Sequence, residues 1–285
     1  MARCDLGRTI IDELRLCYIA EQTLLQELSK IEIGKWRDYE NFSLFRVHSR
    51  HFQYSYDILY DTENSRIKVA TLRFGHYGEP QQTPYVYYRI ENHILYNHDM
   101  LTTTLTLPHI LGFTFQHITT LDLAQDHTFD IVQRIRKIAK EPKTKVIING
   151  KVIDKKQDIN GAMMVYTLNF TKVRNPSICL KQAKAEHDKT KGLTLCAYNK
   201  HNEIETESHK HYILDFYNNP KTLHRLEVHQ NNQEIKDYCK NHNITQDINL
   251  IFNQQFLDDM YHTHLASILR FTHGRTKVNW HEILQ

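Results

Sequence analysis

The feature that most constrains the fold is a run of short, aromatic-rich segments between residues 42 and 97. The segments FSLFRV, HFQYSYDILYD, SRIKVATLRF and YVYYRI alternate apolar with polar residues, which is typical of half-buried strands. Turn-forming residues at 61–64 and 75–78 separate them. The pattern predicts a meander of antiparallel strands.

Periodicity and turn signals predict the other elements. Apolar residues at nearly helical spacing predict an amphipathic N-terminal helix over residues 8–31, which Gly34 ends. Residues 101–111 favour a short helix interrupted near Pro108, and Asn149-Gly150 indicates a hairpin turn. Further strands are predicted at 117–126, 161–170, 192–200 and 221–230, further helices at 129–140, 232–240 and about 252–271, and a polar connection at 174–191.

The order of these elements favours an α+β fold, because strands and helices mix without a strict βαβ rhythm. We expect antiparallel sheets in two similar packed halves, flanked by an N-terminal helix and C-terminal helices. The corresponding segments are an N-terminal helical segment (1–40), a central domain (41–245) and a C-terminal helical segment (246–285). No linker rich in Gly, Pro or Ser separates the halves.

Composition narrows the class of protein. The 285 residues are 40% hydrophobic, and no apolar run approaches the roughly 20 residues of a membrane span, so we expect a cytoplasmic protein with no membrane partner. The five cysteines lack C-x-x-C spacing, which favours reduced, mostly buried thiols over a zinc ribbon or a disulfide scaffold. The net charge of +3 does not by itself indicate a nucleic-acid partner.

The segment Asp122-Leu-Ala-Gln-Asp126 carries the first candidate site. On a strand, alternation places both aspartates on one face and Leu121 and Leu123 on the other. At about 3.3 Å per residue the two carboxylates lie about 13 Å apart, so they share one ion only if the chain bends or another strand supplies partners. Such carboxylates suit a hard cation like Mg²⁺, and the alternative is a solvated strand face.

Two later segments carry charged side chains at strand ends. In Tyr198-Asn-Lys200-His-Asn-Glu203, a nearby lysine favours the phenolate form of a tyrosine nucleophile. The alternative is a rim tyrosine beside a lysine that reaches into solvent. In Arg225-Leu-Glu227 the two charged side chains point the same way, which is common on strands. Within a wider acidic cluster, Glu227 is a candidate metal ligand and Arg225 a candidate phosphate-binding group.

The order of these segments resembles that of plasmid and phage replication initiation factors. The resemblance runs over roughly residues 45–240 and rests on SRHFQYSYD, ENHILY, ITTLDLAQD, LCAYNKHNE and HRLEV. It is to rolling-circle initiators of the Rep_trans type and to related relaxases of integrative elements. It implies that the central domain is a metal-dependent nickase, in which a tyrosine attacks a phosphodiester at a hairpin origin. The tyrosine stays joined to the 5′ phosphate and leaves a 3′ hydroxyl for a polymerase.

The resemblance also implies roles for particular residues and partners. It implies a site for Mg²⁺ or Mn²⁺, and as partners it implies origin DNA, a host helicase, a polymerase and a second copy of the chain. The implied metal ligands are Asp122, Asp126, Glu203 and Glu227, the implied phosphate-binding groups are Lys200 and Arg225, and the nucleophile is either Tyr198 or Tyr238.

One position departs from the family pattern and leaves rival interpretations open. The family usually has an arginine two residues before the first aspartate, and Thr120 stands there in this chain. The same chemistry in a relaxase for conjugative transfer is one alternative. The other is a DNA-binding regulator of the same family that does not cleave DNA.

Overall fold

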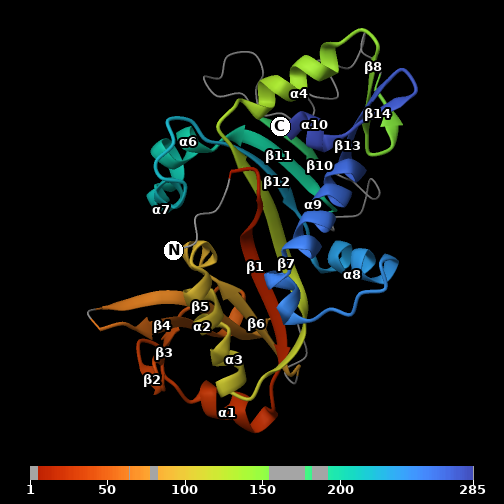
Figure 1. Cartoon of the computed structure of the whole chain (residues 1–285). Helices are drawn as coiled ribbons and strands as arrows, with labels where there is room; N and C mark the ends of the chain where they lie inside the picture. The colour runs from red at the N-terminus through yellow and green to blue at the C-terminus, as the bar shows by residue number, and fades with distance from the viewer. Residues whose placement is uncertain (1–5, 64, 78–82, 154–176, 182–191, 285) are drawn as a thin grey trace. The chain divides into compact units, whose positions relative to one another are not determined.

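The computed structural model describes residues 6–63, 65–77, 83–153, 177–181 and 192–284, and its fold is α+β with antiparallel sheets, as the sequence predicts (Figure 1). The chain forms two compact units. Unit 1 comprises Met1–Ile11, Asp122–Ile244 and Asn249–Gln285, and unit 2 comprises Asp12–Leu121 and Thr245–Ile248. The predicted similarity and packing of two halves stay predictions. No helix within the described ranges is long and apolar enough to cross a membrane.

Unit 2 is built on the predicted antiparallel meander. Its strands lie in the order β1-β6-β5-β4-β3-β2. The bounds are β1 (Thr9–Ile19), β2 (Trp36–Tyr39), β3 (Phe42–Val47), β4 (Phe52–Asp61), β5 (Arg66–His76) and β6 (Tyr85–Ile90), and the helices are α1 (Gln22–Ser29), η1 (Asn92–Tyr96), α2 (His98–Thr104) and α3 (Thr106–Ile110). Two buried phenols join the sheet to helical segments: Tyr56 donates to the carbonyl of Leu28 at 2.8 Å and Tyr88 to that of Thr104 at 3.0 Å.

The predicted N-terminal helix over residues 8–31 is wrong in its first half. Residues Thr9–Ile19 form strand β1, and only Gln22–Ser29 is helical. Leu14 and Leu16 are both fully buried, which matches the two-residue period of a strand, and β1 pairs with β6 with Arg15 opposite Arg89. The spacing of apolar residues fits either period here, and this long-range pairing decides between them. Pro108 lies within α3, where the first turn of a helix tolerates proline.

Unit 1 contains two antiparallel sheets. The first has the order β10-β11-β12-β7 and the second β14-β13-β8-β9. Their strands are β7 (Thr114–His127, which belongs to unit 1 from Asp122 on), β8 (Thr144–Ile148), β9 (Lys151–Val152), β10 (Ile178–Lys181), β11 (Thr194–Asn199), β12 (His224–His229), β13 (Leu269–His273) and β14 (Thr276–Val278). The helices are α4 (Ile131–Lys140), α6 (Lys200–Glu203), the π-helical η2 (Ile204–Ser208), α7 (His211–Phe216), α8 (Asn232–Asn241), η3 (Ile248–Phe252), α9 (Gln254–Ile268) and α10 (Trp280–Leu284). Helix α9 packs against β11 and β12.

Unit 1 confirms some predictions and corrects others. The hairpin turn at Asn149-Gly150 is present, with positive φ angles of 50° and 79° that suit a two-residue turn. The predicted polar connection at 174–191 contains β10, which pairs with β11. The C-terminal segment is not purely helical, because β13 and β14 follow α9 and pair through a turn at Gly274. The strand predicted at 161–170 lies outside the described residues.

Candidate metal centre

Strand register brings the candidate residues onto one face of the first sheet of unit 1. Strand β12 lies between β7 and β11, with Arg225 opposite Asp126 on one side and opposite Tyr198 on the other. Glu227 lies opposite Ala124 of β7 and Cys196 of β11. Because side chains alternate between faces, residues at these registered positions share a face. Residues about a hundred positions apart in the sequence therefore become neighbours.

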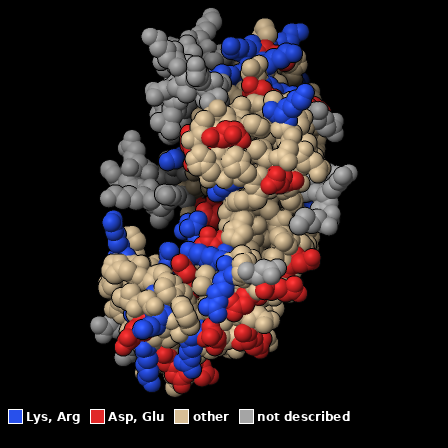
Figure 2. Space-filling model, turned by 90° about the vertical axis from the view of Figure 1, so that its left-hand side faces the viewer, with Lys and Arg blue, Asp and Glu red and all other residues tan. Residues whose placement is uncertain are grey.

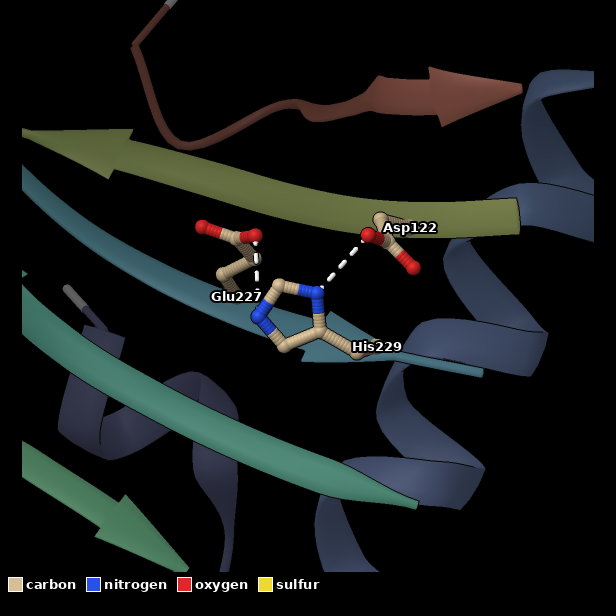
Figure 3. A group of neighbouring side chains, drawn as sticks. All are labelled: Asp122, Glu227 and His229. Atoms are coloured by element: carbon tan, nitrogen blue, oxygen red, sulfur yellow. Dashed lines mark hydrogen bonds and ion pairs between the residues drawn. The ribbon is translucent and has the colours of Figure 1, made fainter. Parts of the chain in front are cut away.

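Asp122, Glu227 and His229 form a compact group on this face, which we call the triad (Figure 3). The imidazole lies between the two carboxylates: Nδ1 is 2.7 Å from Oδ2 of Asp122, and Nε2 is 3.1 Å from Oε1 of Glu227. The backbone N–H of Gln230 also donates to Oδ1 of Asp122, at 3.4 Å. The two acidic residues are only 5% exposed, whereas 39% of the His229 side chain is exposed. The triad therefore has one side open to solvent.

The triad's donor set fits a divalent cation. Its potential ligand atoms all lie within 4.8 Å of one another. Carboxylate oxygens suit Mg²⁺ and Mn²⁺, and an imidazole nitrogen suits transition metals. Two carboxylates and one imidazole therefore fit Mn²⁺ better than Mg²⁺, which prefers oxygen ligands and water. Asp122 and Glu227 were predicted as ligands, and the structure brings them together.

Tyr198 contacts the triad directly. Its hydroxyl donates to Oε2 of Glu227 at 2.8 Å, so the two oxygens of this carboxylate contact Tyr198 and His229 respectively. A carboxylate at this distance can accept the phenolic proton. The Nζ atom of Lys200 lies 5.6 Å from the centroid of the Tyr198 ring, within range of a cation–π contact.

The other predicted acidic and basic residues form two separate ion pairs. Asp126 binds Arg225 through two hydrogen bonds, from Nε to Oδ1 at 2.8 Å and from Nη2 to Oδ2 at 2.6 Å, and both residues are completely buried. Lys200 is buried at the start of α6, with its Nζ 2.9 Å from Oε2 of Glu203. The structure therefore places Asp126 and Glu203 in ion pairs and not in the triad. It places Arg225 where a phosphate does not reach it.

Tyr238, the other predicted nucleophile, lies on α8 with its ring buried among other aromatic and histidine rings. Its ring stacks on His242 at 4.1 Å between centroids and meets Phe256 and His264 edge-on. Burial raises the pKa of Tyr238, which opposes formation of the phenolate. The geometry therefore favours Tyr198 over Tyr238 as a nucleophile.

The sequence interpretation missed His229. Glu227-Val-His229 has the two-residue spacing that places both side chains on one face of a strand, just as Asp122 and Ala124 share a face. That spacing was a usable signal, because the strand itself was predicted.

Comparison with known proteins adds no further constraint. No protein-family model matches the chain, and no curated protein sequence matches it. The resemblance to rolling-circle initiators therefore rests on the sequence segments alone, and the geometry of the triad carries the functional argument.

Proposed function

We propose that the protein nicks one DNA strand at a specific origin through a tyrosyl–DNA intermediate and so starts rolling-circle replication. The observation that carries the proposal is the hydrogen bond from Tyr198 to Glu227, a carboxylate that also belongs to the triad. A nucleophile, a proton acceptor and a candidate cation site then lie within one group of contacts. A relaxase that starts conjugative transfer would use the same arrangement on a different origin.

The proposed reaction is a phosphoryl transfer. The Tyr198 oxygen attacks the phosphorus of the scissile phosphodiester while its proton moves to Glu227. The bond between phosphorus and the 3′ oxygen breaks, and that oxygen takes a proton from water. The products are a 5′ phosphotyrosine and a free 3′ hydroxyl, from which a host polymerase and helicase would continue. A divalent cation at the triad would neutralise charge on the non-bridging phosphate oxygens.

The buried ion pairs support a second candidate function. The two cations assigned to the phosphate, Lys200 and Arg225, are each at most 2% exposed and paired with a carboxylate. On the described part of the face drawn in Figure 2, Lys and Arg side chains are intermixed with Asp and Glu, and the net charge is only +3. The burial of both cations leaves them unable to hold the scissile phosphate, and this favours a DNA-binding regulator that does not cleave. Binding would then depend on local basic groups and would weaken steeply with salt.

A nicking assay distinguishes the two functions. Supercoiled DNA that carries the gene with its flanking sequence is incubated with the protein, with and without Mn²⁺ or Mg²⁺. We expect nicked circles and a denaturant-resistant protein–DNA adduct only when the cation is present. Tyr198→Phe should abolish the adduct, and Tyr238→Phe, the matched control, should retain it. Asp122→Asn should abolish nicking and spare DNA binding.

Three results would each overturn one part of the proposal: the nicking, the nucleophile or the role of the triad. Binding without nicking by the wild-type protein would support the regulator. An adduct that persists in Tyr198→Phe would move the nucleophile elsewhere, and peptide mapping of the adduct would identify it. Nicking that survives both Asp122→Asn and removal of divalent cations would separate the triad from the chemistry.

A further inference from the structure

Two cysteines lie directly opposite each other on adjacent strands of unit 1. Cys179 of β10 and Cys196 of β11 are registered partners in an antiparallel pair, and their Sγ atoms are 3.0 Å apart. Both side chains are partly exposed, whereas Cys17 and Cys239 are buried, at 1% and 3% exposure. The pair therefore differs from the other described cysteines in both proximity and access.

The backbone geometry at this pair suits a disulfide. Directly opposed residues of an antiparallel pair have Cα atoms about 4.5–5.5 Å apart. Disulfides span Cα separations of about 4.4–6.8 Å. Joining the two sulfurs therefore needs rotation of the two side chains without a shift of either strand.

We propose that Cys179 and Cys196 are a redox-active dithiol, which a peroxide converts reversibly into a disulfide. The Cys179 thiolate attacks one peroxide oxygen, the O–O bond breaks, and water leaves after protonation, which makes a sulfenic acid on Cys179. The Cys196 sulfur then attacks that sulfur, the S–S bond forms, and a second water leaves. Two electrons pass from the two sulfurs to the peroxide. A dithiol reductant then supplies two electrons to the disulfide and restores both thiols.

The surroundings favour Cys179 as the attacking sulfur. The hydrogen bond between the two thiols lowers the pKa of the Cys179 thiol, and the positive charge of Lys181 acts in the same direction. Cys196 has the opposite shift, since the hydrogen bond to Cys179 and burial both raise its pKa. The thiolate is the reactive form of cysteine. We therefore assign the attack on the peroxide to Cys179 and the formation of the disulfide from the sulfenic acid to Cys196.

The dithiol lies beside the candidate site. Cys196 is opposite Glu227 of the triad and two residues before Tyr198 on the same strand. A disulfide would therefore tie the strand that carries Tyr198 to β10. Any effect of the disulfide on nicking rests on the proposed function, whereas the proposal that the two cysteines form a disulfide does not.

The test measures the number of free thiols and does not require nicking activity. The full-length protein is treated with hydrogen peroxide, unfolded, alkylated and weighed by mass spectrometry. The chain has five cysteines, so we expect five alkylated thiols before oxidation and three after it, with a peptide cross-link between Cys179 and Cys196. Dithiothreitol should restore all five. Cys196→Ser should form no cross-link and should leave a sulfenic acid on Cys179 that dimedone traps.

Cys239→Ser is the matched control, because it makes the same chemical change at a buried cysteine outside the pair. It should form the cross-link at the wild-type rate. Circular dichroism checks that each variant is folded. Five free thiols after peroxide treatment of folded protein would overturn the proposal, as would a cross-link that involves other cysteines equally. Because the readout is mass, neither result depends on whether the protein nicks DNA.

Discussion

Removal of one partner of the buried Arg225–Asp126 ion pair should destabilise unit 1 strongly. Both residues are 0% exposed and share two short hydrogen bonds. Replacing one partner leaves the other charge buried without its counter-ion, which costs about 3–5 kcal/mol. That is a large part of the roughly 5–15 kcal/mol that keeps a typical protein folded. Removing both charges costs far less, because no unpaired charge remains.

A double-mutant cycle tests the ion pair, with replacement residues that fit a buried strand. Asp126→Val and Arg225→Met each lower the free energy of unfolding by about 3–5 kcal/mol, and the double variant loses less than either single one. Urea unfolding followed by fluorescence measures the cycle. The Trp36→Phe background leaves Trp280 as the one tryptophan, and it reports on unit 1 because it is 5% exposed and donates to the carbonyl of Leu269 at 3.0 Å.

Two outcomes would refute this reasoning. Single variants that lose less than about 1 kcal/mol, with an unchanged dependence on urea, would show that water screens the pair. A stable Asp126→Val variant that loses Mn²⁺ binding, while Arg225→Met retains it, would assign Asp126 to the cation site, as the resemblance implies. Comparing the two single variants therefore separates a ligand role of Asp126 from the role of the ion pair.

Two further predictions concern histidines. His229→Ala should weaken Mn²⁺ binding at least tenfold and Mg²⁺ binding less, because an imidazole nitrogen suits Mn²⁺ better; calorimetric titration measures both, and equal losses would argue against His229 as a ligand. Burial lowers the pKa of His127 and of His264 to about 4, so between about pH 6.5 and pH 4 the unfolded chain binds protons that the folded chain does not. The free energy of unfolding should therefore fall as the pH drops through this window, by about 1.4 kcal/mol per pH unit for each histidine, and His264→Gln should reduce the slope in urea titrations at stepped pH. An unchanged slope in that variant would contradict the assignment.

Much of the fold could be predicted from the sequence where one period dominates. The strands around Asp122 and Glu227 alternate clearly, and the meander of unit 2 is marked by its turns. The N-terminal segment could not be predicted, because Leu14 fits a helical stripe as well as a strand face, and only pairing with β6 decides. Strands β13 and β14 are short; β14 pairs with β13, and β13 gains its other partner, β8, from a hairpin more than a hundred residues earlier.

The residues of the candidate site could be predicted from the sequence, but not which of them contact one another. Residue types and faces follow from alternation, so Asp122, Glu227 and Tyr198 were available from the sequence. Register is a long-range property, and it decides that Asp126 meets Arg225 while Asp122 meets His229. Four carboxylates therefore resemble one acidic cluster in the sequence, whereas in the structure two belong to the triad and two to ion pairs.

The buried pair and the triad are linked through that register. Along β12, Arg225, Glu227 and His229 follow one another at two-residue steps of about 6.6 Å, from the buried interior to the open side of the triad. A slip of one residue between β7 and β12 would turn Asp122 to the opposite face, and it would also separate Asp126 from Arg225. The ion pair penalises that slip, since it would leave two buried charges unpaired. We therefore expect the double variant Asp126→Val/Arg225→Met to fold yet bind Mn²⁺ more weakly than the wild type, and full-strength binding would show that hydrophobic packing alone holds the register.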